Sequence, residues 1–547
     1  MEAKTEAAEQ HWSKPKSGGK IKIFAAISAA VLVTAAAVCG GLRAYFNPAI
    51  HPSVLGEPKV IFPSAKETGG EIFFLSDPDE LWIDWGDGSI VRCGRVDKTF
   101  SYTIRPYKEE TYSGFSGEIK GDEVKIYSMG RMRRFECLEE QLTQIDLSGC
   151  PELVKLVLHE NRLERLDVSM LRELTYLNCE YNSLTELDVT HNEKLEHLYC
   201  KDNPVSELDL SHNEALKYLG CAGNPGETDF LTALDLSHNP ALEVVGCSYQ
   251  PITSLDLSNV PQLRELYCNN CKLTSLVLTQ NPALTKLNCG NNSLTELDVT
   301  KNPLLERLEC YRNSLDSLDI LHNISLTRLN CSQNHINQLD FSDNKALVWL
   351  DCSDNGCGRL DVSGNTAIAY LQCGGNRLKS LDVTHNKGLK YLHCGYNDLE
   401  QIDVSQNADL SILYVNYTKI TSIDVSKNPL LTELGCSDLK LEGLDLSHNP
   451  ELSELYCEYS ELTELDVTKN PALVWLYCSG NKFTSLDLSH NPDLDTLECH
   501  NGRLTSLDLS HNTRLTRLDF RWNPDIGDVD ISMLAEMKEF NCALTKG

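Results

Sequence analysis

The residues best suited to chemistry in this chain are its cysteines, most of which return at intervals of 21 residues. The chain holds 22 cysteines, and the register slips by five residues between Cys221 and Cys247 and by one before Cys542. The members of the series are Cys137, Cys179, Cys200, Cys221, Cys247, Cys268, Cys289, Cys310, Cys331, Cys352, Cys373, Cys394, Cys436, Cys457, Cys478, Cys499 and Cys542. Thiols repeated in this way could form disulfides between neighbouring repeats or bind metal ions.

The residues that replace cysteine in this series argue against both chemistries. Leu158, Val415 and Phe520 occupy the cysteine position in three repeats, where a bridge could not form. No pair of CxxC motifs is present, so zinc binding is not indicated. Free cysteine packs well as a small apolar side chain in a narrow core. We therefore interpret the series as buried, reduced thiols and expect no metal site and no cofactor. The remaining cysteines suggest no pairing and are Cys39, Cys93, Cys150, Cys271 and Cys357.

Aspartate repeats as regularly as cysteine, as in Asp188 and Asp209, with Val277 as the one break. These carboxylates contribute to a formal net charge of −30, which argues against nucleic acid and anionic membranes as partners. The row could bind cations, or it could be a solvated feature hydrogen-bonded to the Ser or Thr two residues later. Histidine often precedes the turn asparagine, as in His191, but Lys301 takes the same position, which indicates a surface turn.

No catalytic constellation accompanies these repeats. The sequence contains no Ser/His/Asp frame, no nucleophile elbow and no phosphate-binding loop. Its carboxylates recur as a row instead of converging on one pocket. We therefore expect no catalytic residues and do not expect an enzyme.

The elements that position these residues follow from one repeat, residues 184–203. It contains two copies of the frame LxxLxΦxxN, and within each copy Leu-x-Φ alternates inward and outward, as a short strand must. Leu187 and Val189 would face the core in one copy, and Leu198 and Cys200 in the other. The closing asparagine suits a tight turn, where its amide can hydrogen-bond adjacent coils. No stretch of this repeat has the ten or more residues of 3.6-residue periodicity that a helix on the outer side would need.

This frame, with cysteine in a 21-residue repeat, is similar to that of the cysteine-ladder internalins, leucine-rich-repeat surface proteins of bacteria. The resemblance covers about residues 136–545 and implies a leucine-rich-repeat solenoid. From the two strand-like segments per repeat we expect a mostly β solenoid of about 20 coils, with strands on both faces. Equal spacing on the two sides predicts a gently curved rod.

The N-terminus predicts export. Residues 1–22 read as a cytoplasmic tail, and residues 23–42 form an uncharged run long enough to span a bilayer, which we interpret as a transmembrane helix that serves as a signal anchor. The lysines before this run exceed the single Arg43 after it, which places the N-terminus in the cytoplasm and the repeats outside. A cleaved signal peptide is the alternative, because Ala35-Ala36-Ala37 provides a small-x-small site. Lipid modification of Cys39 is a third, poorer fit, since Val38 precedes it.

The remaining domain boundaries follow from changes in the residue pattern along the chain. Residues 43–56 form a linker, residues 57–135 form a β-rich, sandwich-like N-cap, residues 136–520 hold the repeats, and residues 521–547 form a last irregular coil and C-cap. The segment Trp82–Ser89 resembles the WGDG turn of polycystic-kidney-disease-type (PKD-type) β-sandwich domains. Its carboxylates are spaced for a tight turn rather than for a calcium loop.

Aromatic side chains fill outward positions of the cysteine-bearing strand, where period-two alternation excludes them from the core. The candidate partner-binding residues are Trp349, Asp351, Tyr370, Tyr391, His393, Tyr414, Tyr456, Trp475 and Tyr477. Exposed Tyr and Trp give large contact areas with a polar tip, which is typical of binding surfaces. The simpler alternative is that these rings stabilise the sheet by stacking across strands.

Two functions fit this surface. The resemblance to internalins implies a cell-surface protein that binds a protein partner by adhesion or recognition. Glycan binding by the same Tyr and Trp stripe is the alternative, with rings stacked on sugars.

Overall fold

The computed structural model describes residues 55, 57–63, 71–77, 80–94, 114–128, 130–224 and 231–542. The segments 1–22 and 23–42, interpreted above as a tail and a membrane anchor, lie outside the described residues. Within the described residues, no helix has the length and apolar character needed to cross a membrane.

The first described strands form two antiparallel arrangements. The strands β1 (Val60–Pro63), β6 (Glu123–Tyr127), β3 (Glu80–Asp84) and β4 (Ile90–Gly94) make a four-stranded sheet in that order. β2 (Glu71–Ser76) pairs with β5 (Gly114–Glu118) and also with β7 (Arg134–Glu136). The region is therefore rich in β-strands, as predicted.

The turn at Trp82–Ser89 has the geometry that its carboxylates predict. Asp84 Oδ1 accepts hydrogen bonds from the backbone N–H groups of Gly86 and Gly88, at 2.9 and 3.0 Å. Asp87 Oδ1 accepts from Ser89 N at 2.9 Å. These carboxylates close a tight turn, and that prediction is confirmed.

Two contacts join this region to the first coil. On one side, β2 lies antiparallel to β7, which in turn begins the parallel sheet of the repeats. On the other side, Ile61 of β1 exchanges backbone hydrogen bonds of 3.0 and 2.7 Å with Asp146. Both sides of the first coil are thus hydrogen-bonded to the N-terminal strands.

The repeats form a leucine-rich-repeat β-solenoid of about 19 turns. From β7 onward, each strand pairs in parallel with the next, in chain order. The strands are β8 (Lys155–Val157), β9 (Tyr176–Asn178), β10 (His197–Tyr199), β11 (Tyr218–Gly220), β12 (Val244–Gly246), β13 (Glu265–Tyr267), β14 (Lys286–Asn288), β15 (Arg307–Glu309), β16 (Arg328–Asn330), β17 (Trp349–Asp351), β18 (Tyr370–Gln372), β19 (Tyr391–His393), β20 (Ile412–Tyr414), β21 (Glu433–Gly435), β22 (Glu454–Tyr456), β23 (Trp475–Tyr477), β24 (Thr496–Glu498), β25 (Arg517–Asp519) and β26 (Glu539–Asn541).

The expectation of strands on both faces of each coil is wrong. Each coil has one three-residue strand, on the side that carries cysteine, and the described residues of the Leu-Asp-Val side form no strand. There the aspartate turns the chain locally, as when Asp188 Oδ1 accepts from Thr190 N at 2.9 Å. The side chain thus caps its own turn, and the backbone of that side makes no ladder with its neighbours.

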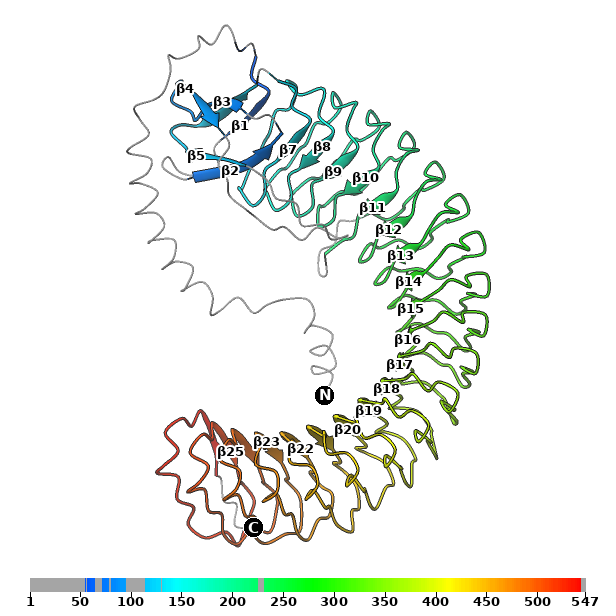
Figure 1. The fold of residues 1–547 in the computed structure, drawn as a ribbon, viewed down its shortest axis with the longest axis vertical. Helices are drawn as coiled ribbons and strands as arrows, with labels where there is room; N and C mark the ends of the chain where they lie inside the picture. The colour runs from blue at the N-terminus through cyan, green and yellow to red at the C-terminus, as the bar shows by residue number, and fades with distance from the viewer. Residues whose placement is uncertain are drawn as a thin grey trace.

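The gently curved rod is also wrong, for the same reason. The solenoid bends into an open, C-shaped arc whose inner side is lined by the parallel strands (Figure 1). Ladder hydrogen bonds hold the strand side at the spacing of a sheet, about 4.8 Å. The outer side lacks this ladder and spreads, so the coils fan outward.

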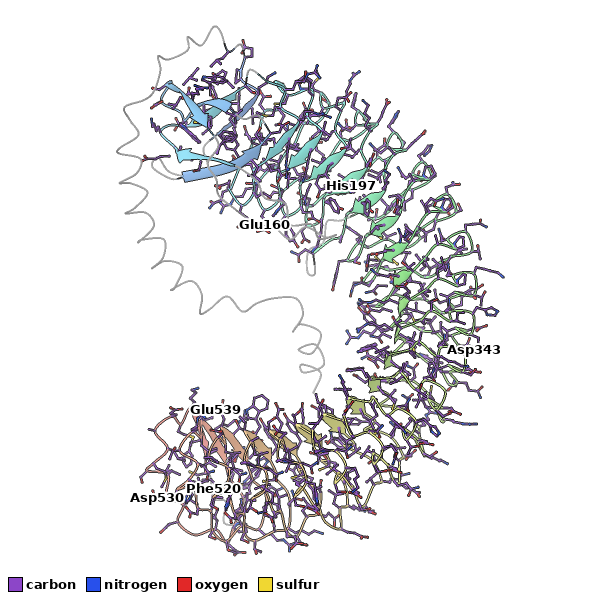
Figure 2. The ribbon with its side chains drawn as sticks, viewed as in Figure 1. Glu160, His197, Asp343, Phe520, Asp530 and Glu539 are labelled. Carbon is purple, nitrogen blue, oxygen red and sulfur yellow. The ribbon has the colours of Figure 1, made fainter. Side chains whose placement is uncertain are left out.

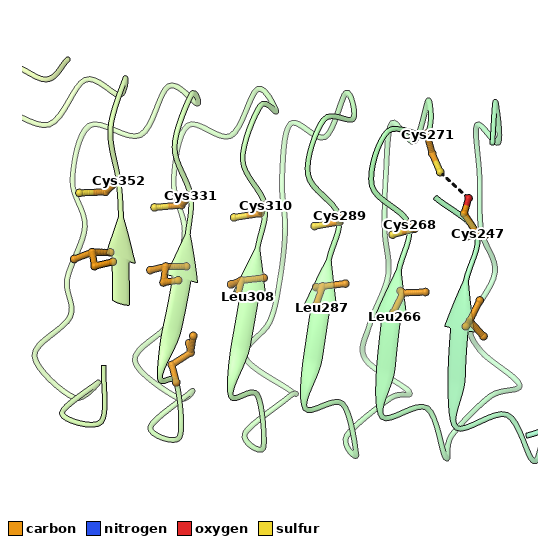
Figure 3. Close-up of a cluster of buried hydrophobic side chains, with 14 of the residues drawn as sticks. Cys247, Leu266, Cys268, Cys271, Leu287, Cys289, Leu308, Cys310, Cys331 and Cys352 are labelled. Carbon is orange, nitrogen blue, oxygen red and sulfur yellow. Dashed lines mark hydrogen bonds between the residues drawn. The ribbon is translucent and has the colours of Figure 1, made fainter. Parts of the chain in front are cut away.

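The core of the arc is the cysteine and leucine interior that the frame predicts. The cysteines of the series from Cys137 to Cys499 are buried thiols, whereas Cys542 is exposed. Figure 3 shows Cys268, Cys289 and Cys310 stacked in line, each beside the strand leucine of its own coil. Burial raises the pKa of Cys289 and of its neighbours Cys268 and Cys310, that of Cys289 to about 12. They are therefore protonated packing groups of low reactivity.

Three cysteines outside the series replace other residues of the frame. Cys150 stands in the position of the outer turn asparagine, and its Sγ donates to the carbonyl of Lys59 at 2.9 Å. Cys271 stands where other coils place the inner asparagine, and its Sγ donates to Cys247 O at 3.3 Å (Figure 3). Cys357 takes a corner leucine position and is buried. Their irregular spacing therefore reflects substitution within the frame rather than pairing.

Two rows of asparagine tie the coils together. At the inner turn, Asn397 Nδ2 donates to Cys373 O and Cys394 O, each at 3.0 Å, while its Oδ1 accepts from Leu378 N. At the outer turn, Asn386 Nδ2 donates to Val362 O and Asn365 O of the preceding coil. The predicted role of asparagine in linking adjacent coils is confirmed.

Candidate recognition surface

The inner face of the arc carries the outward side chains of each strand in two rows. His197 and Glu539 lie on this inner side, whereas Asp343 lies on the outer side (Figure 2). In-register parallel pairing aligns Trp349 with Tyr370 and Tyr391 in one row. The residues two positions later form the second row, and its members here are Asp351, Gln372, His393 and Tyr414.

The first row is a stack of rings. The Trp349 and Tyr370 rings lie 4.9 Å apart between centroids and the Tyr370 and Tyr391 rings 4.1 Å apart, each pair 10° from parallel. Tyr414 meets Tyr391 edge-on, with centroids 6.2 Å apart. Because the rings stack on one another, they present mainly their edges to the space inside the arc. The rings are half-buried, so stacking across strands accounts for part of their role.

The stack ends on a cation that the sequence reasoning did not include. The Arg328 guanidinium lies over the Trp349 ring, 3.7 Å from its centroid. Arg328 also forms an ion pair with the nearly buried carboxylate of Glu309, at 3.1 Å. The sequence could have revealed this contact, because Arg328 precedes Trp349 by one repeat of 21 residues and therefore occupies the same position in the preceding coil.

The second row is held by its own polar contacts. Asp351 Oδ1 accepts hydrogen bonds from the Ser353 N–H at 3.0 Å and from the Ser353 hydroxyl at 2.6 Å. The Tyr370 hydroxyl reaches into this row and donates to Gln372 Oε1 at 2.7 Å. The Tyr414 hydroxyl donates to Glu433 of the next coil. Asp351 and Tyr414 are thereby fixed on the face.

His393 is held in this row without a hydrogen bond to its ring Nδ1. Its Nδ1 is buried without a hydrogen-bond partner, and burial lowers its pKa to about 4. The ring fits because its neighbour is Gly374, whose missing Cβ would lie 2.4 Å from His393 Cε1. At neutral pH His393 is therefore an uncharged ring, 5.6 Å from that of Tyr414.

Tyr456, Trp475 and Tyr477 form a second group farther along the arc. The Tyr456 and Tyr477 rings stack at 5.0 Å, and the Tyr456 hydroxyl donates to Glu454 Oε2 at 2.8 Å. Gly435 lies between the two groups in the second row, next to Tyr414. The structure thus divides the candidate residues into two aromatic groups on one continuous face.

A row of more exposed tyrosines was missed. Tyr396 and Tyr417 are 42% and 40% exposed, and their rings stack at 4.6 Å. Both have left-handed backbone conformations, with φ of 54° and 56°, as does Tyr459. This position, two residues after each cysteine or its replacement, has the same 21-residue period. Alternation within the Leu-x-Cys strand does not reveal this position, because it lies beyond the end of that strand.

The side chains of this face are suited to contact with another molecule. It offers ring edges, tyrosine hydroxyls and carboxylates over several strands. Within the described ranges, no group of three or more His, Cys, Asp or Glu side chains is placed to hold a metal ion.

Comparisons with known proteins agree with this architecture. A family profile described as Leucine Rich repeat matches residues 511–535. A search of curated proteins finds no match. The functional domain of InlJ from Listeria monocytogenes, which includes a cysteine ladder, is 31% identical with a TM-score of 0.55, over 70% of this chain and 78% of that chain.

Two more distant structures share the fold alone. YopM from Yersinia enterocolitica is 23% identical with a TM-score of 0.62, over 75% of this chain and 91% of its own. The Arabidopsis receptor kinase HAESA, solved with the peptide hormone IDA and the co-receptor SERK1, is 18% identical with a TM-score of 0.61, over 76% and 79% of the two chains.

Proposed function

Since the chain belongs to the leucine-rich-repeat family, in the cysteine-ladder internalin branch, we propose that it recognises a protein partner on the inner face of its arc. Leucine-rich-repeat proteins of internalin and receptor type are typical protein-binding surface proteins, and the fold is typically non-enzymatic. The observation that carries the proposal is the ring stack of Trp349, Tyr370 and Tyr391, continued by Tyr414. A frame-conforming coil requires none of these side chains, because they point away from the core.

The polar members of the face support the same reading. Asp351, Gln372 and His393 lie between or beside the rings, so aromatic area and hydrogen-bonding groups alternate, as in the hot spots of protein interfaces. Tyr456, Trp475 and Tyr477 would extend the contact along the arc. HAESA, the receptor solved with a peptide hormone, illustrates that this fold can hold a polypeptide.

Glycan binding by the same stripe has less support. A sugar ring stacks on an open aromatic face, but Trp349 is covered by Arg328 on one side and by Tyr370 on the other. Tyr370 has rings on both of its faces. These contacts favour a protein partner.

We also propose the arrangement at the cell surface. Residues 23–42 would anchor the chain, with residues 1–22 in the cytoplasm and the repeats outside, unless the segment is cleaved as a signal peptide. Residues 57–135 would act as a PKD-like cap that seals the first coil, a role supported by the contacts of β2 with β7 and of Ile61 with Asp146. Terminal caps of this kind protect the open core of a solenoid.

A selection experiment tests the proposed function. Residues 57–547 are immobilised and used to select binders from a displayed library of extracellular proteins. A selected partner should bind the Tyr370→Ala/Tyr391→Ala variant at least tenfold more weakly than wild type, because the variant lacks two hot-spot rings. A tenfold loss of affinity corresponds to about 1.4 kcal/mol of binding free energy. The matched control is Leu304→Ala/Ile324→Ala, which truncates exposed side chains in turns outside the strands. Equal binding to both variants would contradict the proposal.

A further inference from the structure

The charge of the inner face changes along the arc. Around β14–β16 it carries cations at Lys286, Arg307, Arg312 and Arg328. The corresponding inner-face segments of β20–β24 are 411–417, 432–438, 453–459, 474–480 and 495–501. They contain no lysine or arginine, and their carboxylates are those of Glu433, Asp438, Glu454, Glu458, Asp495 and Glu498. We call this region the acidic face.

Aromatic rings are interleaved with these carboxylates. The Tyr456 hydroxyl donates to Glu454 at 2.8 Å, and the Tyr414 hydroxyl donates to Glu433. Tyr417 and Tyr459 stand at its margin, 40% and 43% exposed. Carboxylates beside tyrosine rings are complementary to lysine and arginine, whose stems pack on rings while their charged ends pair with carboxylates.

The acidic carboxylates differ from those on the outer side of the same coils. Each outer aspartate is satisfied by its own turn, as Asp445 is by Ser447 N at 2.9 Å. On the acidic face, burial together with the nearby Glu498 and Asp438 raises the pKa of Glu458. Glu458 is therefore repelled by Glu498 and Asp438, and a cationic ligand would relieve that repulsion.

The surrounding charges set the limits of this face. On β25, Arg517 pairs with Glu498 at 2.8 Å and Asp519 pairs with Arg521, which follows the strand, at 2.6 Å. His500 lies 3.8 Å from Asp519 and contacts the Ser479 hydroxyl at 2.9 Å. The carboxylates of Asp438, Glu454 and Glu458 consequently form the centre of the acidic face.

We propose that the acidic face binds an extended polypeptide segment rich in lysine and arginine. This inference rests on the proposed function and names the chemistry of the partner. Five strands about 4.8 Å apart span about 19 Å along the arc, which equals about six residues of extended chain at 3.3 Å per residue. Basic side chains on alternate residues of such a segment face the same side, toward the carboxylates.

The test uses the full 547-residue chain in a neutral detergent and a fluorescent seven-residue peptide that alternates lysine or arginine with serine. Fluorescence anisotropy measures its binding to wild type and to Asp438→Asn/Glu454→Gln/Glu458→Gln. The control is Asp424→Asn/Asp445→Asn/Asp466→Asn, which removes the same charge from the outer side of neighbouring coils. We expect the first variant to weaken binding by about tenfold or more and the control by less than about twofold. Binding of the wild type should also weaken as salt is raised.

Three outcomes would overturn the inference: no binding of the basic peptide to wild type, equal loss in both triple variants, or equal binding of the same peptide with glutamate in place of lysine and arginine. Thermal melting of each variant separates loss of binding from loss of fold. The Tyr370→Ala/Tyr391→Ala variant should still bind the basic peptide, because its substitutions lie outside the acidic face. If the peptide test fails while a selected partner still requires Tyr370 and Tyr391, the proposed function stands without this inference.

Discussion

At the scale of single residues, the face is shaped as much by its glycines as by its rings. Gly374 leaves room for His393, and Gly435 leaves room for Tyr414. A side chain at either glycine would occupy the volume of the neighbouring ring. The irregular positions of the inner face are therefore matched in pairs across adjacent coils.

Gly435→Ala should destabilise the chain and displace Tyr414. The added Cβ would lie 2.3 Å from Tyr414 Cδ1 and 2.8 Å from Asn416 Nδ2. Overpacking of this kind costs about 1–3 kcal/mol, so the thermal midpoint should fall. Gly443→Ala is the control, because nothing lies within 4 Å of its added Cβ. Equal midpoints for the two variants would show that the Gly435–Tyr414 fit is unimportant.

His393 should make stability depend on pH. Burial lowers its pKa to about 4, whereas an unfolded histidine titrates near about 6.5. As pH falls from about 6.5 toward 4, the unfolded chain therefore binds a proton that the folded chain does not. The folded state loses stability by at most about 1.4 kcal/mol per pH unit over that window.

Thermal midpoints at pH 7 and pH 5 measure this effect. Wild type should lose more stability between the two than His393→Gln, which carries no titrating ring. The control is His385→Gln, at an exposed turn, and it should lose as much as wild type. An identical pH response of wild type and His393→Gln would contradict the buried, neutral state of His393.

At the scale of the element, one coil is a closed turn held by asparagine. The frame predicted the inward leucine and cysteine, the outward rings and the bridging amides. It could not predict that only one side would be a strand, because Leu-Asp-Val alternates just as Leu-x-Cys does. The decision comes from Asp188 and its equivalents, which hydrogen-bond the N–H two residues later instead of leaving the chain extended. That preference is local, and alternation alone does not reveal it.

Restoring the frame residue in a coil that departs from the frame should raise the thermal stability of the chain. Thr418 stands where Asn397 stands one coil earlier, and its Oγ1 donates only to Val415 O, at 2.9 Å. Thr418→Asn would restore donation to two carbonyls, and at about 1 kcal/mol per net hydrogen bond it should raise the thermal midpoint. Asn397→Leu should lower it by removing four side-chain hydrogen bonds. A lower thermal midpoint for Thr418→Asn together with a higher one for Asn397→Leu would refute the bridging role of asparagine.

The thiols provide a second test at this scale. In a Cys39→Ser background, which removes a cysteine outside the described residues, a thiol-reactive dye should label Cys542 in the native chain. It should label Cys93 slowly, because burial raises its pKa to about 11. The buried ladder thiols should react only in denaturant. Rapid native labelling of Cys310 or Cys394 would show that the strand side chains point the opposite way.

At the scale of the molecule, the arc gives the inner face its concave shape. Curvature was the feature that the sequence predicted worst. It depends on the difference between the coil spacing on the strand side and the coil spacing on the outer side, and the repeat sequence does not reveal that difference. Once the strands occupy the inner side, Trp349, Tyr370 and Tyr391 line a concave surface together with the acidic face farther along. The outward register of the strand residues predicted the candidate residues. The roles of Arg328, Tyr396 and Tyr417 became visible only from the positions of the neighbouring coils in the structure.

The central claim is that the partner lies on this concave, strand-lined side. Hydroxyl-radical footprinting of the chain, alone and with a selected partner, measures it directly by mass spectrometry. We predict that the partner lowers oxidation of Trp349, Tyr396 and Tyr417 and leaves Met170 and Ile324, exposed away from the strands, unchanged. Protection of Met170 or Ile324 with undiminished oxidation of the inner rings would contradict the account.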